Sequence, residues 1–247
     1  MLKTEVFRNA PITEALIDIR IQPAQDLSMA KLEALHGFIQ TEYPEKQKRT
    51  MWEGSFELKE EKEPLARTQS QVIGYLFKSA DGKQVVQFRL DGFTFSRLRP
   101  YTRWEDIFGE AKRLWDVYRV HAKPVRVNRL ATRYINSIEI PSKKFDYDDY
   151  FKMAPKVPPD LPQLLSHFFT RLVVPFPDEG VTAIITQTPS EKPDPINSAV
   201  IFDIDVFKEV NLSPDNAKID EIFARLRKVK NEIFSCSITD KTKELFR

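Results

Sequence analysis

Cysteine, glycine and histidine are scarce in this sequence of 247 residues, which has one Cys, 7 Gly and 3 His. The lone Cys236 cannot form an intramolecular disulfide, and a single thiol is typical of a reducing compartment. The chain has no Gly-x-Gly-x-x-Gly, Walker, Gly-x-Ser-x-Gly or His-Glu-x-x-His motif. His36, His121 and His167 lie far apart, without a Cys or carboxylate at metal-ligand spacing. We expect no metal site and no cofactor, and we recognise no catalytic site in the sequence.

An excess of one charge and long apolar runs are also missing. The 38 basic residues face 36 acidic ones, which is not the balance of a protein that binds nucleic acid through a broad cationic surface. Glu5, Arg8 and Glu14 interrupt the first twenty residues, so these do not resemble a signal peptide. No later stretch approaches the ~18 apolar residues of a membrane span. We therefore expect a cytoplasmic protein that binds neither membranes nor nucleic acid.

Hydrophobic residues make up 41% of the chain and include 18 Phe, which is ample material for a packed core. Alternating apolar and polar side chains predict a strand over 14–22. Asp81-Gly82 and Asp91-Gly92 separate further alternating runs, so residues 72–98 are expected to form a meander of three strands. Apolar residues at helical spacing predict a helix over 104–118 that faces the core.

The second half of the chain repeats the order strand, helix, strands, helix. Further strands are predicted over 125–140, 181–187 and 199–207, and further helices over 26–43, 161–172 and 218–234. Residues 45–70 are expected to be a mobile or edge segment, and 141–160 and 188–197 to be loops. The fold class that follows is α+β: an antiparallel sheet in two similarly ordered halves with helices packed on one face, of the helix-grip or TATA-binding-protein-like kind. The chain is expected to act as one functional unit over 1–247, whether or not it divides into subdomains 1–122 and 123–247.

Charged and amide side chains in the predicted strands are the candidate functional residues. If the polar faces of those strands coincide, the sheet presents arginines and aspartates together. Three interpretations of such a face are open: a solvated surface of cross-strand ion pairs, a site where arginine forks hold a phosphate or carboxylate, and a protein interface or nucleic-acid platform. The candidate ligand-binding residues are Arg89, Arg97, Arg129, Arg133, Asn136, Asp203 and Asp205.

Several stretches are more distinctive than their secondary structure requires. They are Phe7 to Ala15, Asp91 to Leu98 with Pro100, Tyr101 and Trp104, Arg133 to Asn136, Leu161 to Gln163, Phe202 to Phe207, Lys230 to Phe234, and Ile238 to Asp240. With these motifs the chain resembles, over almost its whole length, a sporadically distributed prokaryotic family of conserved hypothetical proteins. The resemblance implies one functional unit and carries over no catalytic residue. The patchy distribution of the family suggests a role in mobile-element or defence biology.

The pattern favours a protein without a catalytic site that binds a partner or a second copy of itself, such as a partner-bound regulator. The alternative is a binder or hydrolase of a phosphorylated small molecule or nucleotide, acting through the arginines and aspartates. The C-terminal segment is predicted to begin a short helix at Thr239 or Asp240 and to bring Leu245 and Phe246 back onto the fold.

Overall fold

The computed structural model describes residues 7–57, 65–163, 165–191 and 196–247. Within these ranges the chain is an α+β protein built on one antiparallel sheet of nine strands. The strands are β1 (Ile12–Gln22), β2 (Glu45–Glu57), β3 (Leu65–Lys78), β4 (Gln84–Arg89), β5 (Gly92–Leu98), β6 (Arg126–Ile140), β7 (Thr170–Phe176), β8 (Val181–Pro189) and β9 (Ser198–Leu212). The helices are α1 (Met29–Ala34), the 3₁₀ helix η1 (Leu35–Phe38), α2 (Trp104–Ala122), α3 (Tyr147–Tyr150), α4 (Lys218–Ser237) and α5 (Asp240–Glu244).

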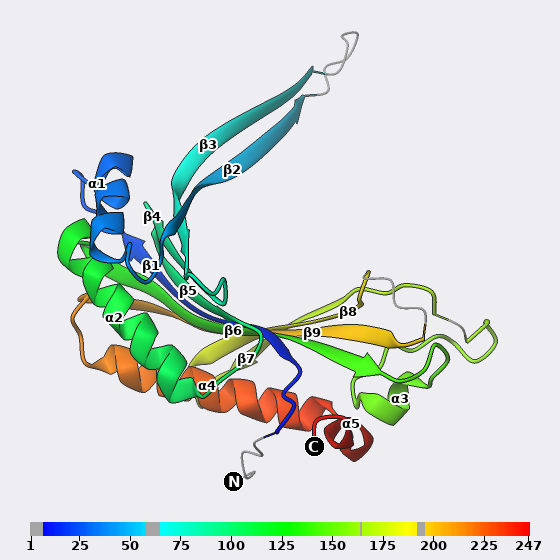
Figure 1. The fold of residues 1–247 in the computed structure, drawn as a ribbon. Helices are drawn as coiled ribbons and strands as arrows, with labels where there is room; N and C mark the ends of the chain where they lie inside the picture. Colours follow the sequence, from blue (N-terminus) through cyan, green and yellow to red (C-terminus); the bar gives the residue numbers. More distant parts are fainter. Residues whose placement is uncertain (1–6, 58–64, 164, 192–195) are drawn as a thin grey trace.

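The sheet is arranged symmetrically about its two central strands, β1 and β6. The strand order is β2-β3-β4-β5-β1-β6-β9-β8-β7, so that β5, β4 and β3 follow outward from β1 as β9, β8 and β7 follow outward from β6. The two halves therefore have the similar order that the sequence predicts. Because β1 and β6 pair directly, both halves belong to one continuous sheet. Figure 1 shows the β2–β3 hairpin rising from one end of this twisted sheet while β7 to β9 extend from the other.

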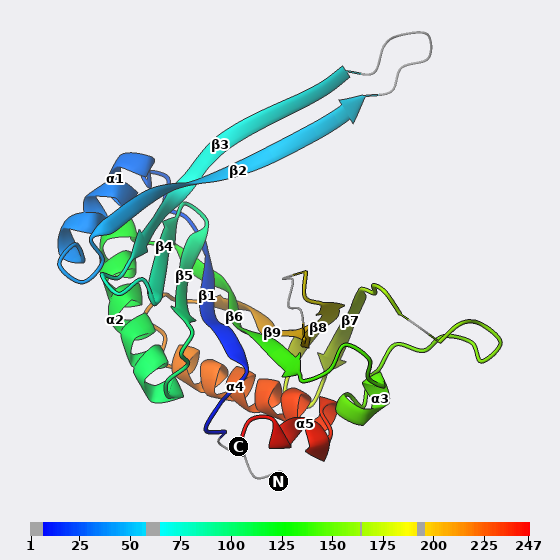
Figure 2. The ribbon, with the colours of Figure 1, turned by 45° about the vertical axis from the view of Figure 1, so that its right-hand side comes forward.

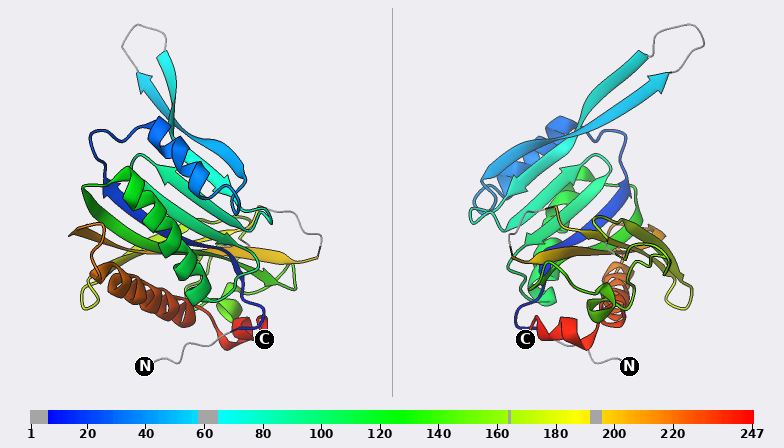
Figure 3. Two further views of the ribbon diagram at one scale, coloured as in Figure 1. Left: turned by 60° about the vertical axis from the view of Figure 1, so that its left-hand side comes forward. Right: turned by 90° about the vertical axis from the view of Figure 1, so that its right-hand side faces the viewer.

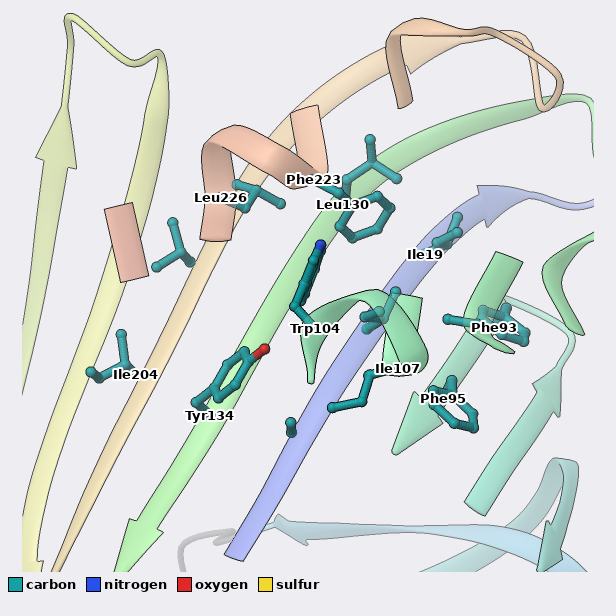
Figure 4. Packing of buried hydrophobic residues seen from close by; sticks show 14 of the residues in the cluster. Ile19, Phe93, Phe95, Trp104, Ile107, Leu130, Tyr134, Ile204, Phe223 and Leu226 are labelled. Carbon is teal, nitrogen blue, oxygen red and sulfur yellow. The ribbon is translucent and has the colours of Figure 1, made fainter. Parts of the chain in front are cut away.

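The helices cover one face of the sheet. Figure 3 shows α2 and α4 side by side on that face, each beneath one half of the sheet. Apolar residues at helical spacing bury one side of each helix, and the acidic residues Glu105 and Asp106 in the first turn of α2 favour its start by interacting with the helix dipole. The packed side chains form one core shared by the two halves, in which Phe93 and Ile19 lie near α2 while Ile204 of β9 lies on the side of α4, to which Leu226 belongs (Figure 4).

The predicted meander over 72–98 and the long helices of both halves are confirmed. Two predictions are wrong in extent or kind. The helix over 26–43 is only six residues long before it tightens into η1, which contains Gly37, a poor helix former. The expected helix over 161–172 does not form in the described residues: residues 161–163 and 165–169 are not helical, and Thr170–Phe176 instead pairs with β8 as an edge strand.

The two ends of the described chain pack against each other. Thr239 caps α5 by accepting a hydrogen bond from the backbone N–H of Thr242 (3.3 Å), as the sequence predicts. Phe246 then returns to the fold: its carbonyl accepts from the backbone N–H of Asn9 (2.9 Å), and its ring lies 5.4 Å from that of Phe7. This contact closes one wall of a cavity described below.

Candidate binding face of the sheet

One face of the sheet has no described helix over it (Figure 2), and the strand register places a group of charged side chains on that face. Cross-strand pairing sets which side chains share it: Asp18 lies opposite Thr94 on one side and Ala131 on the other, and Arg133 lies opposite Asp205. We call this surface the inner face. It includes Asp18 and Arg20 of β1, Gln87 and Arg89 of β4, Thr94 and Ser96 of β5, Arg129 and Arg133 of β6, and Asp203 and Asp205 of β9.

Two of the seven candidate residues lie on the opposite, helix-covered face. Arg97 pairs with Ala15 and shares a face with Phe93 and Phe95; its Nε donates to the carbonyl of Pro100 at 3.3 Å. Asn136 is buried, and its Nδ2 donates to the carbonyl of Phe202 at 2.9 Å. The structure therefore brings together Arg89, Arg129, Arg133, Asp203 and Asp205 and separates Arg97 and Asn136 from them.

Arg89 is the most deeply buried ion of the inner face, with only 3% of the residue exposed. Its Nη2 lies 3.0 Å from Asp18 Oδ2, and its Nε lies 2.9 Å from Asp91 Oδ1. Its remaining nitrogen donates to the hydroxyl of Thr94, which in turn donates to Asp18 Oδ2 at 2.7 Å. A glycine makes room for this arginine, because a Cβ at Gly74 would lie 2.7 Å from the Cα of Arg89.

Asp18 connects the two halves of the sheet electrostatically. Besides Arg89, its carboxylate accepts from Arg20 Nε at 3.0 Å and from Arg129 Nη1 at 3.5 Å. Arg129 also reaches Asp205 Oδ2 at 3.1 Å, and its guanidinium lies 4.4 Å from the centre of the Phe207 ring. Asp18 lies in the strand predicted over 14–22 but is not among the candidates, since only the cross-strand register shows that three arginines converge on it.

The far end of the inner face holds a simpler pair. Arg133 Nε lies 2.9 and 3.0 Å from the two oxygens of Asp203, a two-pronged contact that suits the planar guanidinium. Hydrogen bonding to Asp203 raises the pKa of Arg133. Because the Arg133 side chain is 46% exposed, solvent screens this pair and it contributes little to stability.

Burial and ion pairing act in opposite directions on the aspartates. Burial works to raise the pKa of Asp91, but Arg89 and Arg20 outweigh it and hold that pKa below its ordinary value. At Asp205 burial dominates instead and raises the pKa, despite the nearby Arg129 and Arg133. Among the carboxylates of the inner face, Asp205 is thus the one whose burial most disfavours the charged form.

Replacing Asp205 by Asn tests that assignment. A carboxyl group whose folded pKa is raised stabilises the fold below its unfolded pKa, near 3.8, and that contribution is lost as pH rises through the folded value. At pH 7 we expect the free energy of unfolding of Asp205→Asn to be ~0.5–1 kcal/mol higher than that of the wild type. Near pH 3 this gain in stability should disappear. Urea unfolding at the two pH values measures it; a variant less stable by more than about 1 kcal/mol at pH 7 would contradict the assignment.

Several buried polar atoms beneath the inner face have no hydrogen-bond partner among the described residues. They are Gln87 Oε1, Ser96 Oγ and Asp205 Oδ1, and the register places all three side chains on this face. Buried polar atoms are normally paired, so unpaired ones need an explanation such as a missing partner. Two of the three, the oxygens of Gln87 and Asp205, can only accept hydrogen bonds.

The described residues contain no group of three His, Cys, Asp or Glu side chains that could hold a metal ion. In the same residues no helix has both the length and the apolar character that crossing a membrane requires. A scan against protein-family models finds no match to the chain, and a search of curated proteins finds none. The inner face must therefore be interpreted from its own chemistry.

Proposed function

We propose that the protein is a binding protein and that its inner face binds a polypeptide segment of a protein partner. The observation that carries this proposal is the mismatch on that face: the arginines that β1, β4 and β6 contribute are already paired, whereas the atoms left without partners include the acceptors Gln87 Oε1 and Asp205 Oδ1. Backbone N–H groups and lysine or arginine side chains supply the donors that such acceptors require.

The same chemistry disfavours an anionic ligand on the inner face. To bind the arginines of β1, β4 and β6, a phosphate would have to displace Asp18, Asp203 or Asp205 from them, and it would add acceptor oxygens beside the unpaired acceptors Gln87 Oε1 and Asp205 Oδ1. The near balance of charges on this face argues equally against nucleic acid, whose affinity depends on uncompensated Lys and Arg. A regulatory role in mobile-element or defence biology stays a prediction.

Site-specific photo-crosslinking tests the proposal. We expect a photoreactive residue at Ile135, which lies on the inner face beside Asp203, to capture one defined partner from cells that express the protein. The matched control is Ala224, an exposed position on the outer side of α4. An added Thr186→Arg substitution, beside Asp203 on the same face, should abolish the Ile135 adduct by occupying the surface.

The adducts distinguish binding of a partner at the inner face from self-association and from contacts that are not specific to this face. An adduct at Ile135 that is absent at Ala224 and lost with Thr186→Arg supports the proposal. If the adduct is a second copy of the chain, light scattering shows the corresponding homo-oligomer, which is the self-association form of the same function. Adducts that are equal at both positions, or that survive Thr186→Arg, would contradict it.

A further inference from the structure

A cavity of about 700 Å³ lies on the other side of the sheet, away from the inner face. It is bounded by α4, by the start of α2, by the helix-covered side of β6 and by the packed chain ends at Phe7 and Phe246. Aromatic side chains, including Tyr101, Trp104 and Phe234, form much of its wall. Sites that bind small molecules have volumes of ~300–1,000 Å³ and walls of this kind.

Lys230 of α4 lines this cavity and is only 8% exposed. Among the described residues its ammonium forms no ion pair; its Nζ instead lies 3.7 Å from the centre of the Tyr134 ring. A buried lysine without a carboxylate is rare, because taking the charge out of water costs several kcal/mol unless a counter-ion compensates it. Burial, followed by the charge of Arg227, lowers the pKa of Lys230 to about 7.

The charge around the cavity favours an anion. Its described walls contain five basic side chains, Arg8, Arg99, Arg103, Arg227 and Lys230, against two carboxylates. Those carboxylates are Glu105, which accepts from Arg227 at 3.1 Å, and Glu139, which lies 3.7 Å from Arg99. Both are therefore engaged away from Lys230.

The remaining titratable groups that face Lys230 are phenols. Burial raises the pKa of Tyr101, and it raises that of Tyr134 well above the ordinary value, so both stay uncharged near neutral pH. Their hydroxyl groups lie 3.4 Å apart. Neither phenol can act as the counter-ion that Lys230 lacks.

The sequence motifs that the fold alone does not explain meet at this cavity. Residues from four of them, Phe7 to Ala15, Pro100 to Trp104, Arg133 to Asn136 and Lys230 to Phe234, contribute to its wall. The candidate Asn136 is one of these residues, and its amide is tied to the carbonyl of Phe202. These stretches are far apart in the chain, so the fold brings them to one place.

We propose that this cavity binds a small organic molecule that carries a carboxylate or phosphate group, with the Lys230 ammonium as the counter-ion and the aromatic walls around the apolar part. The anion-binding function that the sequence suggested for the arginine strands is thereby assigned to a different site. It is independent of partner binding at the inner face, which lies on the opposite side of the sheet.

Isothermal titration calorimetry with three probes tests this site: inorganic phosphate, phenyl phosphate and benzoate. Benzyl alcohol, which has a similar ring and no charge, is the control ligand. We expect the wild type to bind phenyl phosphate or benzoate, and the one that binds identifies the group, while benzyl alcohol does not bind. Lys230→Met should weaken binding about tenfold or more, whereas Lys228→Met, an exposed lysine on the same helix that pairs with Glu179, should leave it unchanged.

A second measurement uses only the wild-type protein. Because the free amine is largely neutral at pH 8 and the bound one must be charged, binding should take up about one proton there and almost none at pH 6. Titrations in buffers of different ionisation enthalpy measure this uptake. Failure of all three anions to bind the wild type, unchanged binding by Lys230→Met, or binding at pH 8 without proton uptake would each overturn the proposal.

Discussion

Asp18→Ala is expected to destabilise the fold by ~3–5 kcal/mol, more than any other single charge removal on the inner face. The substitution leaves Arg89, which is 3% exposed, without its carboxylate partner on β1, and it also removes a contact of Arg20 and of Arg129. The buried guanidinium then keeps only Asp91 as a carboxylate partner, and its burial limits the hydration that could replace Asp18. Urea unfolding at pH 7, followed by circular dichroism, measures the loss.

Asp203→Ala is the matched control, since it removes an aspartate of the same sheet face. Its partner Arg133 is 46% exposed and can return to water, so this loss should not exceed about 1 kcal/mol. The double variant Asp18→Ala with Arg89→Met should recover much of the stability, because it removes the stranded charge together with its partner. Equal losses for Asp18→Ala and Asp203→Ala would show that Asp18 is not the centre of the network.

The parts of the fold that the sequence predicted are those set by local chemistry. Asp81-Gly82 and Asp91-Gly92 specify tight turns by themselves, and α2 and α4 have apolar residues at helical spacing over many turns. The segment 161–172 was mistaken for a helix because short apolar runs do not distinguish helix from strand. There the decisive interaction is non-local, namely the pairing of β7 with β8.

The candidate site was predicted only in part. The alternation of side chains along a strand decides which face each one occupies, and for two candidates it was not applied. Arg97 follows Phe93 and Phe95 at intervals of two, and Asn136 follows Tyr134 in the same way, so alternation alone places both on the apolar face. The charge of Arg97 suggested the polar face instead, and Asn136 became a candidate because an amide group in an apolar strand normally needs a partner or a ligand. The sequence predicted cross-strand ion pairs as one alternative but not that they centre on Asp18, because this depends on which residues of β1, β4 and β6 lie opposite each other.

Lys230 was missed although the sequence contained a signal for it. It lies four residues after Leu226 and three before Ile233, both buried, so the helical repeat of α4 directs it toward the core. A lysine at a core position of an amphipathic helix indicates either a buried ion pair or a ligand. The structure excludes a buried ion pair within the described residues, since no carboxylate there pairs with Lys230.

Lys230→Met should make the protein more stable without ligand, and the gain should depend on pH in a defined direction. Folding lowers the pKa of this amine from 10.5 to about 7, so the folded state disfavours the charged form. The destabilisation caused by burying this amine is fully present below pH 7. It declines as the pH rises from about 7 to 10.5 and vanishes above about 10.5. We expect a gain on the order of 3 kcal/mol at pH 6 that falls toward zero near pH 10.

Thermal unfolding across this pH range, with Lys228→Met as the control, measures the difference. The exposed Lys228 pairs with Glu179, which raises its pKa, so its removal should bring no gain at any of these pH values. A pH-independent gain for Lys230→Met would indicate better apolar packing alone, and a loss of stability at pH 6 would show that the amine has a partner in the free protein. A gain confined to pH values below about 10 means that burying this amine, charged below about pH 7 and neutralised above it, destabilises the fold. That is the expected energetic signature of a site whose counter-ion arrives with the ligand.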